Sequence, residues 1–309
     1  MRLLIFDPDY KGHHAGYLLH LLRQLKSRAD DGLTVDLLVS EKFRTVHEDV
    51  VESAKAFGSR LRWNLMSTRE ADRILNTPSL LLRGLREAAI IRKAAERRQP
   101  DAILAMYLDY LLFPLALGQL RNLSVTGLIF RQNPHYWSMR FGHLPHRLRV
   151  KAFAKGLLLQ RALRNPALKR CLCLDKFLTK WDGASANREK LVHCPDPVAL
   201  PSTRTNGKEA FSQKTTLLLF GVVTPRKGTT RFLKALKGLD PSTLSRLAIN
   251  IVGPAGSPKE EERIRRTSRK LETSACRIKR TSTFVKDADI QPYFLNCDVV
   301  VLPYLDHIG

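Results

Sequence analysis

The chain has 309 residues, 44% of them hydrophobic and 26% charged, which is ordinary for a globular protein of one or two domains with a sizeable core. Its 52 lysines and arginines exceed its 29 aspartates and glutamates, so the formal net charge of +23 favours nucleic acid, an anionic membrane surface or phosphorylated small molecules as partners, unless the basic surface is generic. Five cysteines without a C-x-x-C pair argue against a zinc site or a disulfide framework and indicate a reduced, cytosolic compartment. Neither a signal peptide nor a membrane-spanning segment is predicted.

The first two thirds of the sequence alternate short apolar strands with amphipathic helices. Strands are predicted at residues 2–8, 33–40, 60–67, 101–108, 125–132, 168–175 and 191–198. Helices are predicted at residues 15–29, 80–98, 111–120 and 146–165. Strands that alternate with helices imply crossover connections and a parallel sheet. The basic helix at 146–165 is either a solvated surface or a membrane-surface contact, because Arg and Lys flank its apolar residues.

A second α/β segment follows a stretch rich in Pro, Ser, Thr and Gly, which is typical of a linker. Its strands are predicted at 215–223, 246–253, 282–285 and 297–303, and its helices at 229–239 and 257–272. The sequence therefore predicts an N-terminal Rossmann-like domain at 1–200, a linker at 201–214 and a partial C-terminal Rossmann-like domain at 215–309.

The loop after the first strand contains Gly12, His13 and His14. A glycine between a strand and a helix lets backbone amides and the helix N-terminus approach an anion or a hydroxyl-rich ligand. The two histidines could donate hydrogen bonds in a binding site, belong to the loop structurally, or bind a metal, although no third ligand is near them in sequence.

The stretch FGVVTPRKGTTRF carries the strongest signal for a ligand. Gly221 ends a strand, Gly228 precedes a helix, and Arg226 and Lys227 project from the loop between them, while a threonine at 229 or 230 is expected to cap the helix. Two cations beside exposed amides suit a pyrophosphate, and the alternative is an exposed basic turn. Gly253 ends the next strand in the same manner.

Together these stretches resemble the retaining GT-B glycosyltransferases, over nearly the whole chain and most closely from Thr216 onward. The family element G-x-x-x-x-x-K-G is matched by Gly221, Lys227 and Gly228, and the resemblance implies that Lys227 pairs with the donor diphosphate. The arginine that usually follows the first glycine is replaced by Val222, so its role is assigned to Arg226. The segment FVKDADIQPYFLNCDVVVLPY is similar to the family segment that ends in a buried strand and a proline.

The resemblance also implies functions for residues outside these elements. Gly12 matches the glycine-rich first loop, which in the family lies against the donor phosphates and the acceptor, and Asp109 follows the fourth strand as a candidate contact to the sugar or acceptor. His307 stands where the family has its first glutamate, in a loop that resembles a P-Y-x-x-H-x-G branch. Asp109 and His307 are therefore the candidate catalytic residues. Because the family continues past this loop to a second glutamate, the chain is expected to be truncated.

The implied activity is transfer of a sugar, with retention, from a nucleotide diphosphate donor to a hydroxyl acceptor, such as a lipid-linked glycan or an envelope polysaccharide. Lys227, Arg226 and nearby helix N-termini would stabilise the leaving diphosphate, and neither a metal nor another cofactor is implied. The expected location is the cytoplasm, at the inner face of the membrane if the basic surface docks on anionic lipid. The alternatives are an inactive remnant or a basic protein that binds anions or nucleic acid, although no nucleic-acid-binding motif is present.

Overall fold

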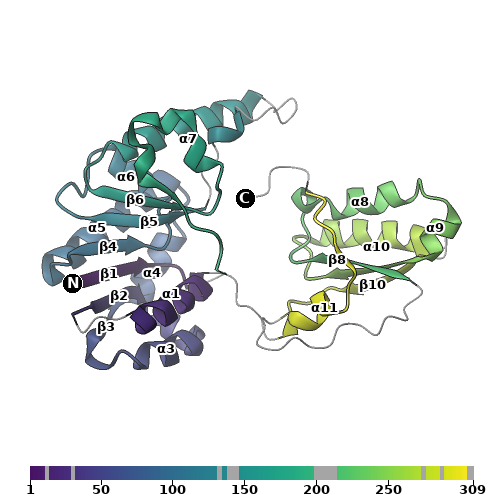
Figure 1. The fold of residues 1–309 in the computed structure, drawn as a ribbon, viewed down its shortest axis with the longest axis horizontal. Coiled ribbons are helices and arrows are strands. Elements are labelled where there is room, and N and C mark those ends of the chain that lie inside the picture. Colours follow the sequence, from purple (N-terminus) through teal and green to yellow (C-terminus); the bar gives the residue numbers. More distant parts are fainter. Residues whose placement is uncertain are drawn as a thin grey trace. The chain divides into compact units, whose positions relative to one another are not determined.

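The computed structural model describes residues 1–10, 14–28, 32–130, 134–137, 146–197, 214–272, 276–285 and 289–304. The chain divides into two compact units, Met1–Val198 (unit 1) and Ala199–Ile308 (unit 2), and each unit is an α/β structure built on its own parallel sheet. Figure 1 shows the two sheets and the helices that cover them. The α/β fold class predicted from the sequence is confirmed.

The described part of unit 1 contains a sheet of seven parallel strands in the order β3-β2-β1-β4-β5-β6-β7. Its strands are β1 (Arg2–Asp7), β2 (Thr34–Ser40), β3 (Leu61–Met66), β4 (Ala102–Ala105), β5 (Val125–Ile129), β6 (Leu168–Cys173) and β7 (Leu191–His193). Central strands such as β2 are buried in nearly every position because both faces of the sheet are covered by helices.

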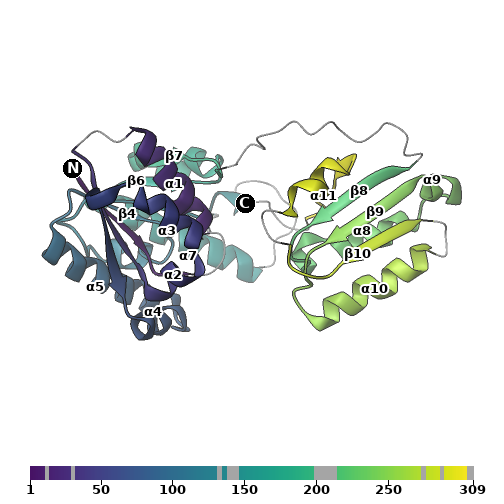
Figure 2. The same cartoon turned by 90° about the horizontal axis from the view of Figure 1, so that it is seen from below.

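The helices of unit 1 form a layer on each face of this sheet, as Figures 1 and 2 show. The α-helices are α1 (His14–Arg28), α2 (Glu41–Val46), α3 (Glu48–Lys55), α4 (Thr68–Leu75), α5 (Leu80–Arg98), α6 (Leu112–Ala116) and α7 (His146–Leu163). Short 3-10 helices are η1 (Gly58–Arg60), η2 (Pro134–Trp137), η3 (Leu178–Lys180) and η4 (Asp182–Lys190). One hydrophobic core lies between the sheet and α5, α6 and α7, and the other lies between the sheet and α1 and α3.

The described part of unit 2 contains four parallel strands in the order β10-β9-β8-β11. The strands are β8 (Thr215–Phe220), β9 (Leu247–Val252), β10 (Arg277–Thr281) and β11 (Val299–Val300). The helices are α8 (Thr229–Leu236), α9 (Pro241–Ser245), α10 (Pro258–Glu272), α11 (Gln291–Leu295) and the 3-10 turn η5 (Pro225–Lys227). Helices α8 and α10 pack together on one face of the sheet, and α11 lies on the opposite face (Figures 1 and 2).

Two strand predictions in unit 2 differ from the structure. Residues 282–285 form no strand, and the strand that pairs with β9 is β10, whose basic sequence RIKRT lacks the expected apolar run. The final strand was expected to be buried, but Val299 and Val300 are 46% and 40% exposed. In the described residues β11 has β8 on one side only, so half of its surface meets solvent.

Candidate functional site

The strand order of unit 2 reverses between β8 and β11, because β9 and β10 lie on one side of β8 and β11 lies on the other. In open parallel sheets, ligands bind outside the carboxyl ends of the strands at such a reversal. A small pocket occupies this position. One wall is formed by Gly221, Lys227 and Thr229, which follow β8, and the other by residues 301–304, which follow β11.

The loop from β8 to α8 is shaped by two glycines in left-handed conformations, Gly221 with φ of 101° and Gly228 with φ of 69°. The prediction of a strand-turn-helix unit here is confirmed. The helix cap differs from the prediction, because Gly228 is the N-cap residue, Thr229 is buried and the Thr230 hydroxyl donates to Glu260 over 2.9 Å. A glycine N-cap has no side chain that competes with a ligand for the first N–H groups of α8. This helix end is therefore suited to an anion.

The Lys227 side chain folds back on the start of its own loop, at Phe220 and Gly221. Its Nζ donates a hydrogen bond to the Phe220 carbonyl over 3.1 Å, and a Cβ atom placed on Gly221 would come within 2.4 Å of that nitrogen. Burial lowers the pKa of the Lys227 amine, and the neighbouring charge of Arg226 lowers it further. A bound anion would offset both effects, because it would return an opposite charge to this partly desolvated cation.

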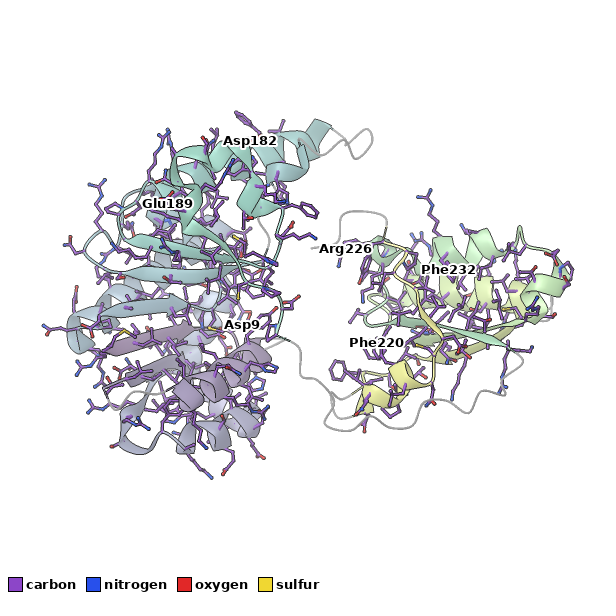
Figure 3. The ribbon with its side chains drawn as sticks, viewed as in Figure 1. Asp9, Asp182, Glu189, Phe220, Arg226 and Phe232 are labelled. Carbon is purple, nitrogen blue, oxygen red and sulfur yellow. The ribbon has the colours of Figure 1, made fainter. Side chains whose placement is uncertain are left out.

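Arg226 lies beside Lys227 and projects from the edge of unit 2 at which β8 ends, as Figure 3 shows. Its guanidinium carbon lies 5.2 Å from the centre of the Tyr304 ring, and the Lys227 nitrogen lies 5.9 Å from the same ring. The two cations from the β8 loop thus meet an aromatic side chain that follows β11, a contact that the sequence analysis missed. Cations over an aromatic face are attracted by its quadrupole.

The loop after β9 packs against the backbone of the β8 loop at Gly221. Gly253 has φ of 116° and packs so closely that an added Cβ atom would lie 2.6 Å from the Gly221 carbonyl oxygen. Arg280 of β10 holds this loop in place. Its Nη1 donates hydrogen bonds to the carbonyls of Ile251, Gly253 and Thr281. Its Nε and Nη2 donate to the Glu261 carboxylate over 3.2 and 2.7 Å. Sequence reasoning missed Arg280, because one basic residue in a basic segment carries no distinguishing signal.

The sheet of unit 1 reverses its order between β1 and β4, so the same rule points to the loops after these strands. Gly12 and His13 fall outside the described residues, as does His307 of the C-terminal segment. His14 is the first residue of α1. Asp109, which follows β4, accepts a hydrogen bond from the Phe130 backbone N–H over 2.8 Å, so it ties the ends of β4 and β5 together.

Aromatic and charged side chains line the same edge of the unit 1 sheet. The Tyr107 ring stacks on both Phe130 and Tyr110, with centroid distances of 4.9 and 5.0 Å. The Arg83 guanidinium lies 3.7 Å from the centre of the Tyr110 ring. Beyond this row, the buried His135 contacts Asp175 over 2.9 Å, and burial lowers the pKa of His135 while Asp175 opposes the shift.

Glu87 is a buried carboxylate behind this row, and its Oε1 pairs with the Arg83 Nε over 2.8 Å. Burial raises the pKa of the Glu87 carboxyl to about 7; Arg83 opposes the rise, and the charges of Asp7 and Asp9 add to it. The folded protein therefore holds this proton more tightly than the unfolded chain, where the pKa is near 4.5. The corresponding stability is present in full below pH 4.5 and is lost as the pH rises through about 7.

We therefore expect Glu87→Gln to change the pH dependence of unfolding. The free energy of unfolding of the wild-type protein, relative to this variant, should fall by on the order of 3 kcal/mol between pH 4.5 and 8. Tryptophan fluorescence in urea can measure this, because all three tryptophans belong to unit 1. The matched control is Glu52→Gln at an exposed position. If the difference in unfolding free energy between wild type and Glu87→Gln does not change with pH, the raised pKa of the Glu87 carboxyl is contradicted.

No group of three or more His, Cys, Asp or Glu side chains within the described ranges is placed to hold a metal ion. No described helix combines the length and apolar character needed to cross a bilayer.

No protein-family model and no curated protein matches the sequence. Solved structures do match its fold. A lipopolysaccharide outer core galactosyltransferase, WaaB, superposes with a TM-score of 0.59 at 11% identity, over 98% of this chain and 74% of that chain. A trehalose-6-phosphate protein of E. coli bound with UDP-2-fluoro glucose gives a TM-score of 0.61 at 11% identity, over 99% and 78%.

A trehalose-6-phosphate synthase, studied for glycosyltransfer with retention, gives a TM-score of 0.57 at 12% identity, over 98% of this chain and 78% of that chain. At such low identity the likeness concerns the fold. The protein has a GT-B-like fold with two Rossmann-like units, as the sequence analysis predicted.

Proposed function

We propose that the protein is a glycosyltransferase that moves a sugar from a nucleotide diphosphate donor, bound by unit 2, to a hydroxyl group of an acceptor. The observation that carries this proposal is the pocket at the strand reversal of unit 2. Lys227 and Thr229, at the glycine-capped N-terminus of α8, line this pocket, and Arg226 lies beside its Tyr304 wall. Three positive features in one place suit a diphosphate better than a single phosphate.

The chemistry follows from where charge develops during transfer. As the bond between the sugar and the diphosphate loosens, negative charge grows on the leaving phosphate oxygens. The Lys227 ammonium can leave the Phe220 carbonyl and donate to those oxygens instead, while Arg226 and the first amides of α8 contribute further positive potential. Gly221 and Gly228 let the backbone approach the phosphates closely, because neither residue has a side chain in the way.

Three finer points belong to the same proposal. Retention is supported by the fold likeness to a trehalose-6-phosphate synthase studied for transfer with retention. A lipid-linked or envelope glycan as acceptor is supported by the likeness to a lipopolysaccharide galactosyltransferase and by the net charge of +23, which suits an anionic membrane surface. The acceptor is assigned to the carboxyl edge of the unit 1 sheet, where Asp109 follows β4 at the strand reversal.

The test is calorimetric titration of the full chain with UDP, ADP and GDP, each compared with its monophosphate. We expect at least one diphosphate to bind about tenfold more tightly than its monophosphate, because the second phosphate adds a charge-assisted contact of about 1.5 kcal/mol. Release of that nucleotide from its sugar donors, in the presence of glycan acceptors, then tests transfer. Equal binding of monophosphate and diphosphate would remove the basis of the proposal, and binding of DNA alone would favour a nucleic-acid function.

A further inference from the structure

An apolar stripe runs along the outer side of α7. Val150, Phe153 and Leu157 are 55%, 65% and 47% exposed, and their spacing places them on one side of the helix. The opposite side of the same helix carries Leu159 and Leu163, which are buried in the core of unit 1. The fold of unit 1 therefore accounts for one side of α7 and leaves the other side, with its large apolar side chains, in solvent. Exposed apolar groups that cluster in this way mark interaction surfaces.

The sequence around this stripe is basic throughout. Between Asp109 and Asp175 there are eleven lysines and arginines and no aspartate or glutamate. Within α7, Lys151 and Arg161 are exposed next to the apolar stripe. The surface thus combines apolar side chains with an excess of positive charge. The neighbouring η4, which contacts α7, adds the exposed acidic side chains of Asp182 and Glu189, and Asp182 is paired with Arg188 over 3.3 Å.

A second apolar group lies at the start of α5, where Leu80, Leu81 and Leu82 are all exposed. Helices α5 and α7 pack on the same core and therefore on the same face of the sheet. Helix α5 leads into β4 and α7 leads into β6, and in a parallel sheet such crossover helices run back from the carboxyl edge to the amino edge. The N-termini of both helices therefore lie at the carboxyl edge of the sheet. The exposed apolar side chains of unit 1 thus favour one face and one edge.

We propose that the outer stripe of α7, formed by Val150, Phe153 and Leu157, docks unit 1 on an anionic lipid bilayer. The helix would lie in the plane of the interface, with the stripe inserted among the acyl chains and the lysines and arginines at the level of the headgroups. Nucleic acid fits this surface less well, because phosphates would pair with the basic residues but give Val150 and Leu157 no partner. This inference goes beyond the transferase proposal and does not depend on it.

The test is binding of the full chain to vesicles, measured by co-sedimentation without any donor or acceptor. Phosphatidylcholine vesicles with about 30% phosphatidylglycerol should bind the protein. Vesicles of phosphatidylcholine alone should bind it at least about tenfold more weakly, since the basic residues near the stripe gain attraction from an anionic surface only. The double variant Phe153→Asp, Leu157→Asp should lose binding by a further factor of about ten or more, because charged side chains cannot insert.

The matched control is Val46→Asp, Leu65→Asp, which changes two exposed apolar residues elsewhere in unit 1 and should bind as wild type does. Undiminished binding by the α7 double variant would overturn the proposal, and equal competition by DNA would show a generic polyanion surface instead. Insertion is tested separately by Phe153→Trp, which keeps a large aromatic side chain. Its added fluorescence should be quenched by brominated phosphatidylglycerol acyl chains, and a lack of quenching beyond that of wild type would also overturn the proposal. Because no donor is present, neither result depends on whether the transferase assay succeeds.

Discussion

Lys227→Ala is expected to weaken binding of the preferred nucleoside diphosphate by about 10- to 100-fold, which corresponds to one charge-assisted hydrogen bond of about 1.5–3 kcal/mol. The variant should lose affinity for the nucleoside diphosphate, while its affinity for the nucleoside monophosphate should stay nearly unchanged. The reason is the position of the ammonium, which lies on the floor of the loop next to Gly221 and beside the end of α8. Titration calorimetry of wild type and variant, at the same salt concentration, measures the difference.

The matched control is Lys234→Ala, which removes an exposed lysine from the last turn of the same helix. It lowers the net charge by the same amount, so any loss of affinity that both variants share is a general charge effect. The melting temperature of the two variants should be close to that of wild type, because the Phe220 carbonyl that Lys227 leaves can be hydrated. A Lys227→Ala protein that binds the diphosphate as wild type does would contradict the assignment of the site.

Gly253→Ala is expected to disrupt unit 2 strongly. A Cβ atom at this position would lie 2.6 Å from the Gly221 oxygen and 2.7 Å from its carbonyl carbon, and φ of 116° is unfavourable for any residue with a side chain. Backbone strain alone costs about 1–3 kcal/mol, and the two loops would also have to separate. Since the Gly221 loop carries the proposed diphosphate site, we expect loss of both stability and nucleotide affinity.

The measurement is hydrogen exchange of the amides of β8 and β9 in the full chain, because the tryptophans report on unit 1 only. Exchange should accelerate by about 100-fold or more, which corresponds to about 3 kcal/mol of opening free energy. Gly238→Ala serves as the control, since an added Cβ there meets only the Ala235 oxygen at 3.5 Å. Wild-type exchange rates and wild-type nucleotide affinity in Gly253→Ala would show that the two loops do not depend on their close contact.

The elements that the sequence predicted well are those whose signal is local. The segment from β8 to α8 alternates an apolar run, a glycine-bearing basic turn and an amphipathic helix, and each part is identified by its own residues. The buried strands of unit 1 are similarly clear, because both faces must be apolar. The likeness of the two units to GT-B structures rests on this regular alternation of strands and helices.

The parts that the sequence did not predict depend on contacts between distant residues. β10 was missed because a half-exposed strand beside β9 can be basic, and Arg280 gains its role only when its guanidinium meets the carbonyls of Ile251 and Gly253. Tyr304 reaches Arg226 across 78 positions of sequence, through the pairing of β11 with β8. No local pattern reports either contact, since both arise only after the sheet has formed.

The exposed side of β11 has a consequence for the protein at high concentration. Within the described residues, this strand presents Val299 and Val300 and a row of backbone groups that β8 does not use. Such an edge can accept a strand from a second molecule, which is how sheets begin to aggregate. The segment after β11 also supplies the Tyr304 wall of the pocket. Intermolecular strand addition and binding of the proposed nucleotide would therefore involve adjacent residues of one segment, so a bound ligand that holds this wall in place would oppose self-association.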